Sequence, residues 1–233
     1  MPLYGLDIET DTTLDGLDPA IAPITSVAII GEHDRIVIEG DESSLLARLD
    51  AAVASLPAGV LVTWNGAAFD LPFIAHRAHL CGVQTGLLLW HDPTIRSRNE
   101  PLSGHPGSYR ATWHQHQHLD GYRVFRADAG AVMRLACGLK PMAKLVGLEP
   151  IEVDRERMHL LTDAERQAYV ASDAEVTRAL IIRRWQTAKA SIDQVDHLGP
   201  AKPFVPPPAL ARELHEPATS EPVEHETQPQ TIG

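Results

Sequence analysis

Apolar and β-branched runs in the first half of the chain predict the strands of an α/β domain. Residues 2–9, 24–30 and 35–39 form three such runs, and turn residues separate the second from the third. Three strands in close succession predict an antiparallel meander. Residues 60–64 and 118–120 predict two further strands, and the helical pattern before 60–64 indicates that this strand joins the sheet in parallel. The expected sheet is therefore mixed and five-stranded.

Apolar residues at helical spacing predict the helices that flank this sheet. Asp41 precedes leucines that share one helical face, and Thr162 and Glu165 have the spacing of a capping box. Asp70 lies near the start of another helix, whose first turn tolerates Pro72. The predicted helices cover residues 41–55, 70–81, 128–136, 139–146 and 162–189.

Residues 82–117 interrupt these patterns and are rich in Gly, Pro, His and Arg, which predicts a long irregular insertion. Residues 91–126 hold five Arg and five His against three acidic residues, so the local charge turns positive. This stretch is either a contact for a nucleic-acid backbone or an ordinary polar insertion. His114, His116 and His118 would share one strand face, as a zinc or nickel site or as the commoner solvated row.

Composition limits the classes of protein to which the chain can belong. A formal net charge of −11 argues against a protein that coats duplex DNA through bulk electrostatics. The sequence lacks both a long apolar run that would span a membrane and the pattern of a secretory signal. Cys81 and Cys137 lie in apolar contexts and are expected to be buried thiols, which suits a cytoplasmic protein.

The composition changes near the C-terminus. Eight of the 18 prolines lie in residues 200–233, which predicts a Pro/Glu-rich disordered tail over residues 198–233, behind a domain of residues 1–190. Residues 209–215 would form at most one helical turn on a protein partner, and a plain solvated tail is commoner. Too few residues follow position 199 for a polymerase domain, so the domain is expected to act alone.

Two acidic side chains near the start of the chain are the first candidates for chemistry. Asp7 and Glu9 are two positions apart on a predicted strand, so they point to the same side of the sheet. Two neighbouring carboxylates repel each other unless they are compensated, and a hard divalent cation is the simplest compensation. The alternative is a pair of solvated residues at a strand end.

Two further segments carry acidic residues in a suggestive pattern. Asp70 lies where a predicted strand passes into a helix. Tyr169 and Asp173 are four positions apart in the long C-terminal helix, so they lie on one helical face. By itself, a tyrosine and an aspartate at that spacing are most often a surface pair.

Taken together, the three segments resemble the three motifs of the DEDDy-type 3′–5′ exonucleases, which belong to the DnaQ-like, ribonuclease H-like superfamily. The motifs are Asp7-Ile-Glu9, Asn65-Gly-Ala-Ala-Phe69-Asp70 and Tyr169-x-x-x-Asp173. The middle motif is most similar to that of the proofreading exonuclease domain of family-B DNA polymerases, as are the segments 118–120 and 139–148. The similarity covers residues 3 to about 187. Each motif is weakly specific, whereas their joint order and separation are specific.

This resemblance implies a ribonuclease H-like fold and a two-metal 3′–5′ exonuclease. The enzyme would release nucleoside 5′-monophosphates from single-stranded DNA ends, in DNA repair or in proofreading in trans. Two divalent ions, Mg²⁺ or Mn²⁺, would be held by the carboxylates. By resemblance, Asp7 would bridge both ions, Glu9 and Asp173 would complete one site, and Asp70 would support the other.

The resemblance also assigns the remaining site residues. Tyr169 would orient the attacking water, since a phenol with a pKa of about 10 is a poor general base at neutral pH. Ile8, Thr10, Asn65 and Phe69 would contact the terminal nucleotide. Phe69 would either stack on a base or pack in the core.

Three alternatives remain open on the sequence. The substrate could be RNA, as in ribonuclease D-like relatives. The chain could be a non-catalytic module that binds nucleic-acid ends, although such modules usually lose one or more of the carboxylates. The Pro-rich tail could recruit a polymerase, a helicase or a repair complex, and this role is compatible with catalysis.

Overall fold

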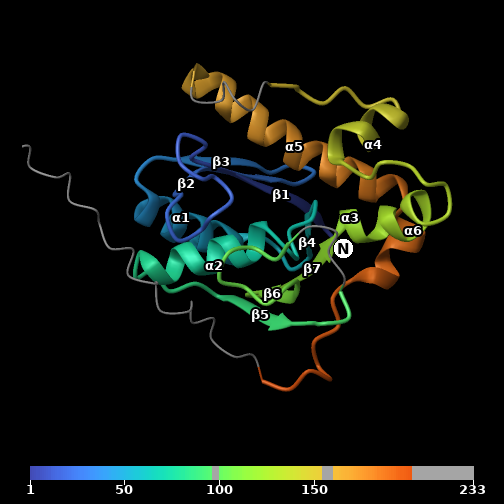
Figure 1. Ribbon diagram of the computed structural model, residues 1–233, viewed down its shortest axis with the longest axis horizontal. Helices are drawn as coiled ribbons and strands as arrows, with labels where there is room; N and C mark the ends of the chain where they lie inside the picture. Colours follow the sequence, from blue (N-terminus) through green and yellow to red (C-terminus); the bar gives the residue numbers. More distant parts are fainter. Residues whose placement is uncertain (96–99, 154–159, 201–233) are drawn as a thin grey trace, which may run out of the picture.

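A seven-stranded mixed sheet forms the centre of the protein in the computed structural model, which describes residues 1–95, 100–153 and 160–200. The strand order is β3-β2-β1-β4-β7-β6-β5 (Figure 1). β1 pairs antiparallel with β2 and parallel with β4, and β4 pairs parallel with β7. The strands are β1 Leu3–Thr10, β2 Ile24–Ile30, β3 Arg35–Glu39, β4 Val60–Thr63, β5 Leu87–His91, β6 Tyr109–Trp113 and β7 His116–Asp120.

The sheet has seven strands and not the predicted five, because the stretch 82–117 is not irregular throughout. It contains β5 and β6, which pair antiparallel, with Leu89 opposite Ala111. β6 alternates buried and half-buried side chains along its whole length. Each of these strands is only five residues long, and the neighbouring Gly and Pro residues hide the alternation in the sequence.

The row of three histidines does not form a metal site. His114 lies with Gln115 in the two-residue turn that joins β6 to β7, and its Nε2 lies 3.0 Å from Asp50 Oδ1. The Nε2 of His116 lies 3.0 Å from the carbonyl oxygen of Val53. The imidazole of His118 contacts Thr63 and the buried Asp193. A tight turn between the first two positions therefore separates rings that a continuous strand would align.

Helices cover both faces of the sheet (Figure 1). Asp41 caps α1 as predicted, and the capping box of Thr162 and Glu165 opens α5. α5 ends at Arg183 and not at residue 189, because a short α6 and a 3₁₀ turn follow. The helices are α1 Glu42–Ser55, α2 Asp70–Leu80, α3 Gly121–Phe125, α4 Leu139–Leu145, α5 Asp163–Arg183 and α6 Trp185–Ala188.

The predicted helix over residues 128–136 is wrong. Residues Arg126–Gly130 form a π-helical turn that continues α3, and an irregular segment follows. The carboxylate of Asp128 accepts from the backbone N–H of Ala129 and pairs with Arg184. Val132 is 76% exposed, so the apolar residues of this segment do not form the packed face that a stable helix would need.

The core is divided between the two faces of the sheet. Leu6 and Ile8 of β1 point to the face covered by α1 and α2, where they pack among residues such as Leu49 and Phe73. The opposite face of β1 and β2 packs against α5 through small residues, including Ala28 and Ala174. Alternation along β1 therefore sends Asp7 and Glu9 to the α5 face.

Gly5 determines how closely α5 approaches β1. A Cβ atom at this position would overlap the carbonyl oxygen of Ala174 and lie 2.8 Å from its carbonyl carbon. Arg178, one turn further along α5, donates from Nε to the carbonyl oxygen of Leu3 at 2.8 Å. The helix is thus fixed against the strand that carries the first two acidic residues.

The described residues include no helix that is both long and apolar enough to cross a membrane. The tail predicted for residues 198–233 lies, from residue 201 onward, outside the described residues.

Candidate active site

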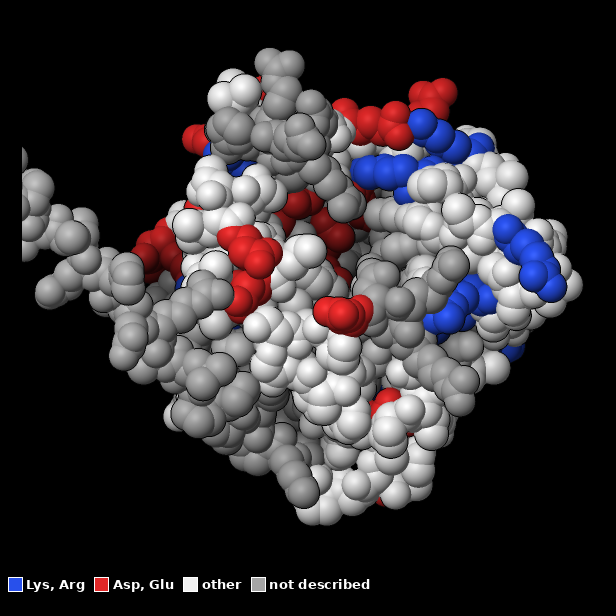
Figure 2. Space-filling view, viewed as in Figure 1, with Lys and Arg blue, Asp and Glu red and all other residues white. Residues whose placement is uncertain are grey.

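Three carboxylates from two distant segments meet at the interface of β1 and α5. Asp7 and Glu9 come from β1, and Asp173 comes from α5, ten residues after the start of that helix. One oxygen from each carboxylate lies within 4.8 Å of the others. Asp173 is buried, whereas the other two are half-buried. Figure 2 shows acidic side chains deep in a hollow near the middle of this face of the molecule.

Asp70 is a fourth buried carboxylate that interacts with this group. It is the first residue of α2 and is 4% exposed. Burial raises its pKa to about 7, and the negative charge of Asp120 acts in the same direction. Backbone hydrogen bonds from its own N–H and from Ile8 oppose the shift. The charge of Asp70 in turn raises the pKa of Asp7, which places the two side chains in one electrostatic cluster.

The pKa of Asp7 is raised well above its ordinary value. Burial is the largest cause, and the charges of Glu9, Asp70 and Asp173 follow in that order. Lys140 is the one group that lowers it among the causes of this shift. The cluster is therefore short of positive charge and favours either protonation or a bound cation.

The raised pKa of Asp70 predicts an unusual pH dependence of stability in the absence of metal. A carboxyl group whose pKa is higher in the folded than in the unfolded protein stabilises the fold at low pH. That contribution is lost as the pH rises from the unfolded pKa of about 4 through the folded pKa of about 7. Asp70→Asn should therefore be more stable than the wild type at pH 7 but not at pH 4, in thermal unfolding with a chelator.

A matched control for this experiment is Asp196→Asn, since Asp196 is exposed near the end of the described chain. It measures how the loss of one exposed carboxylate changes the melting temperature at each pH, and the change expected for Asp70→Asn between pH 4 and pH 7 is larger. If the change for Asp70→Asn were no larger than that for the control, the carboxyl group of Asp70 would not titrate in this range.

Lys140 is a site residue that the sequence did not single out for a role. Its ammonium group pairs with Asp173, donates to the carbonyl oxygen of Ile151 at 2.7 Å and lies 4.4 Å from the centroid of the Tyr169 ring. Tyr169 is 3% exposed and lies one turn before Asp173 on α5. The lysine is 33 positions from Asp173, so no local spacing relates the two. The resemblance of residues 139–148 to the polymerase exonucleases was the one signal available.

The loop that precedes Asp70 is held in place by Asp120. This carboxylate, at the end of β7, accepts from the backbone N–H groups of Asn65 at 2.9 Å and Ala67 at 3.3 Å. Asn65 has a left-handed backbone with φ of 70°. A Cβ at Gly66 would overlap the side chain of Thr63, so the turn requires glycine. The sequence placed Asp120 on a predicted strand, residues 118–120, but did not indicate that its carboxylate supports this loop.

The residues expected to contact the terminal nucleotide lie on β1 and just before α2, the two elements that carry Asp7, Glu9 and Asp70. Phe69 caps α2 and packs on Phe73, with ring centroids 5.3 Å apart. Thr10 donates from its hydroxyl group to the carbonyl oxygen of Gly16 at 2.7 Å. The side chain of Ile8 is 5% exposed and belongs to the core, which leaves its backbone as the part that could face a ligand.

Comparison with known proteins places this geometry in a family. The sequence model of the exonuclease domain of DNA polymerase family B matches residues 13–130, which is half of the chain. The chain belongs to this family. The matched residues include Asn65, Asp70 and Asp120, whereas the carboxylates of β1 and α5 lie outside them.

Two known proteins show how far the similarity extends. The catalytic subunit of DNA polymerase epsilon from Eremothecium gossypii is 29% identical over 149 residues, which are 62% of this chain and 6% of that protein. The chain thus spans a small part of that relative. The family B DNA polymerase from the archaeon Pyrobaculum calidifontis has a similar structure, with a TM-score of 0.58 and 17% identity over 79% of this chain and 24% of that chain. This likeness shows the fold, which is the ribonuclease H-like α/β fold of DnaQ-type exonuclease domains.

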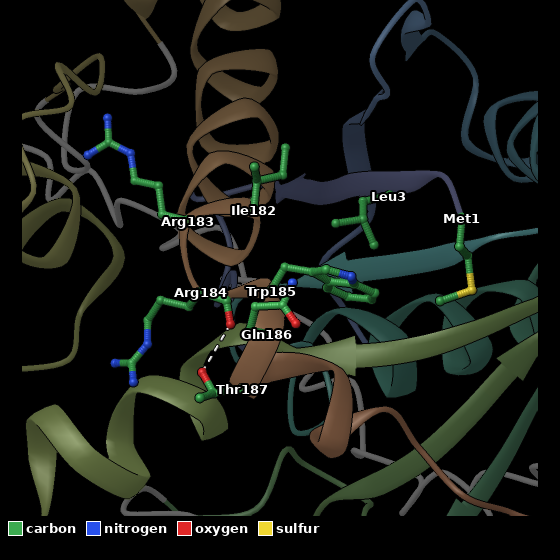
Figure 3. A pocket seen from close by; sticks show the side chains of 8 residues that line it. All are labelled: Met1, Leu3, Ile182, Arg183, Arg184, Trp185, Gln186 and Thr187. Carbon is green, nitrogen blue, oxygen red and sulfur yellow. Dashed lines mark hydrogen bonds between the residues drawn. The ribbon is translucent and has the colours of Figure 1, made fainter.

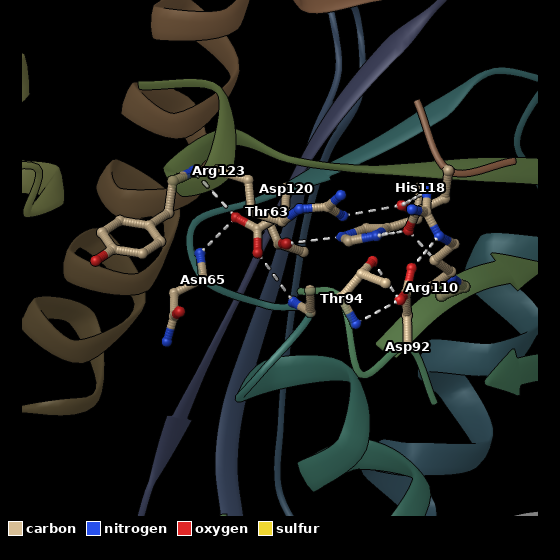
Figure 4. A network of polar contacts seen from close by, with 12 residues as sticks. Thr63, Asn65, Asp92, Thr94, Arg110, His118, Asp120 and Arg123 are labelled. Atoms are coloured by element: carbon tan, nitrogen blue, oxygen red, sulfur yellow. Dashed lines mark hydrogen bonds and ion pairs between the residues drawn. The ribbon is translucent and has the colours of Figure 1, made fainter. Parts of the chain in front are cut away.

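A buried polar network joins the C-terminal segment of this exonuclease domain to the sheet (Figure 4). Asp193, which is fully buried, lies 2.7 Å from His118 Nδ1 and accepts from Arg123 Nη1 at 3.1 Å and from the N–H of Ala111 at 3.1 Å. The other ring nitrogen of His118 lies 2.9 Å from the hydroxyl group of Thr63. The packed structure therefore continues past residue 190.

Removal of the charge of Asp193 should weaken this network. Asp193→Asn keeps the size of the side chain but replaces one accepting oxygen with an NH₂ group, which cannot accept from a donor. We expect a loss of about 2 kcal/mol of unfolding free energy, as is typical of hydrogen bonds to charged groups. Urea unfolding measures it. Asp196→Asn, a nearby exposed substitution, should change the free energy by less than about 0.5 kcal/mol, and an equal effect of both variants would contradict the role of the network.

One pocket of the exonuclease domain lies away from the carboxylates. It has a volume of about 540 Å³ and lies between Met1, Leu3, the end of α5 and Trp185 at the start of α6 (Figure 3). Leu3 and Glu9 are six positions apart on β1, a separation of roughly 20 Å along an extended strand. This pocket is therefore at the opposite end of the strand from the acidic site.

Proposed function

We propose that the domain is a metal-dependent 3′–5′ exonuclease that releases nucleoside 5′-monophosphates from single-stranded DNA ends, in proofreading or repair. The observation that carries the proposal is the convergence of Asp7, Glu9 and Asp173 beside the buried Asp70. A family of polymerase exonuclease domains makes DNA the favoured substrate. RNA is the alternative that the nuclease assay must separate.

The residues of the site fit divalent cations. The donor set consists of carboxylate oxygens alone, which are the ligands that Mg²⁺ and Mn²⁺ prefer. The pKa of Asp7 is raised by burial and by the neighbouring carboxylates. A bound cation would offset both the cost of the buried negative charge and the repulsion between the carboxylates. Asp7, Glu9, Asp70 and Asp173 would hold two such ions. When bound, the ions would activate a water molecule and stabilise the negative charge that develops around phosphorus.

The protein's own side chains would orient the reactants. Tyr169 is fixed against Lys140 and is one turn from Asp173, so its phenol can position a water molecule at the carboxylates. Phe69 stands at the start of α2, directly before Asp70, where its ring would stack on the terminal base without reading the identity of that base. Asn65 is held by Asp120 at the other end of the same turn and would contact the terminal sugar or base.

The test is a nuclease assay with Mn²⁺ on single strands that carry a label at the 5′ end. The proposal requires a ladder of labelled products that shortens from the 3′ end, and nucleoside 5′-monophosphates as the released product. A duplex, a mismatched 3′ end and a matched RNA strand complete the substrate set. Release of the label at the first step would indicate the opposite polarity. Faster cleavage of RNA would transfer the proposal to an exoribonuclease, and binding without cleavage would indicate the non-catalytic module.

A further inference from the structure

A second pocket opens beside the loop that carries Asn65. Its volume of about 360 Å³ is at the small end of the range of ligand pockets, roughly 300–1,000 Å³. Its walls come from three parts of the chain, namely the loop before α2, residues 94, 95 and 108 between β5 and β6, and α3 with the π-helical turn. Among its lining residues are Asn65, Thr94, Ser108, Tyr122, Arg123 and Arg126.

Two arginines, Arg123 and Arg126, line this pocket with one aspartate, Asp120, in a chain whose net charge is −11. Arg123 is held from the inside, because its Nη1 donates to the buried carboxylate of Asp193 at 3.1 Å (Figure 4). The guanidinium carbon of Arg126 lies 6.0 Å from the centroid of the Tyr122 ring, at the outer limit of a cation–π contact. Both side chains are half-buried. Because these contacts already restrain both guanidinium groups, the groups lose less conformational entropy when they bind a ligand.

The pocket borders the acidic site. Asp120 lines the pocket and also interacts electrostatically with Asp70. The carboxylate oxygens of Asp120 already accept from backbone N–H groups of Asn65, Ala67 and Tyr122, so this residue supports the wall of the pocket. Asn65 lines the pocket and stands five positions before Asp70. A strand whose last nucleotide lies at the carboxylates therefore has this pocket as a neighbouring site.

We propose that this pocket binds a backbone phosphate of the substrate strand, upstream of the nucleotide that is cleaved. The inference rests on the proposed function, which supplies the strand. Guanidinium groups and hydroxyl or amide donors are the groups that bind phosphate oxygens with directed hydrogen bonds. Such contacts fix the position of a strand without reading its sequence. The small volume suits one phosphate group with its sugar.

The first experiment measures binding without cleavage. A fluorescent single-stranded oligonucleotide is titrated with the full chain in a chelator, over a series of salt concentrations. Each phosphate contact with a single strand contributes roughly 0.7 to the slope of log K against log salt. Arg126→Gln should lower the magnitude of the slope by about this amount and weaken binding about tenfold at low salt. Arg126→Lys should restore the slope and part of the affinity, because lysine keeps the charge but not the planar group.

The control is Arg35→Gln, which removes one positive charge at the β3 edge of the sheet. Arg35 is the first residue of β3, and its exposed side chain lies 3.9 Å from Glu175. It should leave the slope and the affinity unchanged. An equal change in both variants would mean that total charge alone is measured, and an unchanged slope in Arg126→Gln would overturn the proposal.

The second experiment separates the pocket from the chemistry. The p-nitrophenyl ester of thymidine 5′-monophosphate has a cleavable bond but no upstream nucleotide. We expect Arg126→Gln to lower the ratio of kcat/KM on an oligonucleotide to kcat/KM on this ester about tenfold, mainly through KM. An unchanged ratio would contradict the phosphate subsite. If the wild type cleaved neither substrate, the proposed function would fail, whereas the salt dependence of binding would still test the pocket. Thermal unfolding of each variant identifies any loss that comes from misfolding.

Discussion

Asp7→Asn is expected to abolish nucleotide release while it stabilises the metal-free protein. The variant loses a carboxylate at the centre of the acidic cluster but keeps the size and shape of the side chain. A loss of about 4 kcal/mol of transition-state stabilisation corresponds to roughly a thousandfold in rate, and we expect at least that. The stability effect has the opposite sign, because burial and three neighbouring carboxylates raise the pKa of Asp7 and so make its charge unfavourable.

Two measurements on the same variant check this pair of effects. Mononucleotide release with Mn²⁺ gives the activity, and thermal unfolding with and without Mn²⁺ gives the stability. In a chelator the variant should melt a few degrees above the wild type, since each kcal/mol shifts the midpoint by roughly 2–4 °C in a domain of this size. Mn²⁺ should raise the midpoint of the wild type much more than that of the variant. Activity near that of the wild type would rule out the assigned role of Asp7.

Gly5→Ala is expected to destabilise the fold at the upper end of the range for overpacking, about 3 kcal/mol or more. The added Cβ overlaps the carbonyl oxygen of Ala174, which is backbone and cannot rotate away. α5 must therefore move from β1, and Asp173 moves with it. Activity should fall more than stability alone explains, because a shift of about 1 Å between reacting groups can cost a hundredfold.

Gly138→Ala is the matched control, since the same methyl group there would lie 3.4 Å from Pro141 in ordinary contact. Gly138 caps α4 with φ of −63°, a conformation that alanine adopts. Its cost should not exceed about 1 kcal/mol. Urea unfolding of both variants, with mononucleotide release measured well below the midpoint, separates the two. Equal stabilities would show that α5 can pack on β1 without the glycine.

Much of the fold was predictable because it depends on near neighbours. The capping box at Thr162 and the cap at Asp41 are confirmed, since they depend on residues three positions apart. The two missed strands are short and lie at one edge of the sheet. The pairing of β6 with β7, the pairing of β5 with β6 and the burial of Leu89 in the core contribute more there than the local alternation. The histidine row was misjudged because a turn at His114 depends on the pairing of β6 with β7.

By itself, the sequence determined which side chains of each segment stand together. The two-residue period places Asp7 beside Glu9, and one helical turn places Tyr169 beside Asp173, because both relations are set by backbone geometry alone. The family resemblance led us to expect that these pairs meet, but how they are brought together is decided only by the tertiary structure. The meeting requires the close contact of Gly5 with Ala174, between segments far apart in the chain, which no local pattern encodes. Lys140 with Asp173, and Arg123 with Asp193, are likewise pairs from distant parts of the chain, so no local pattern predicts them.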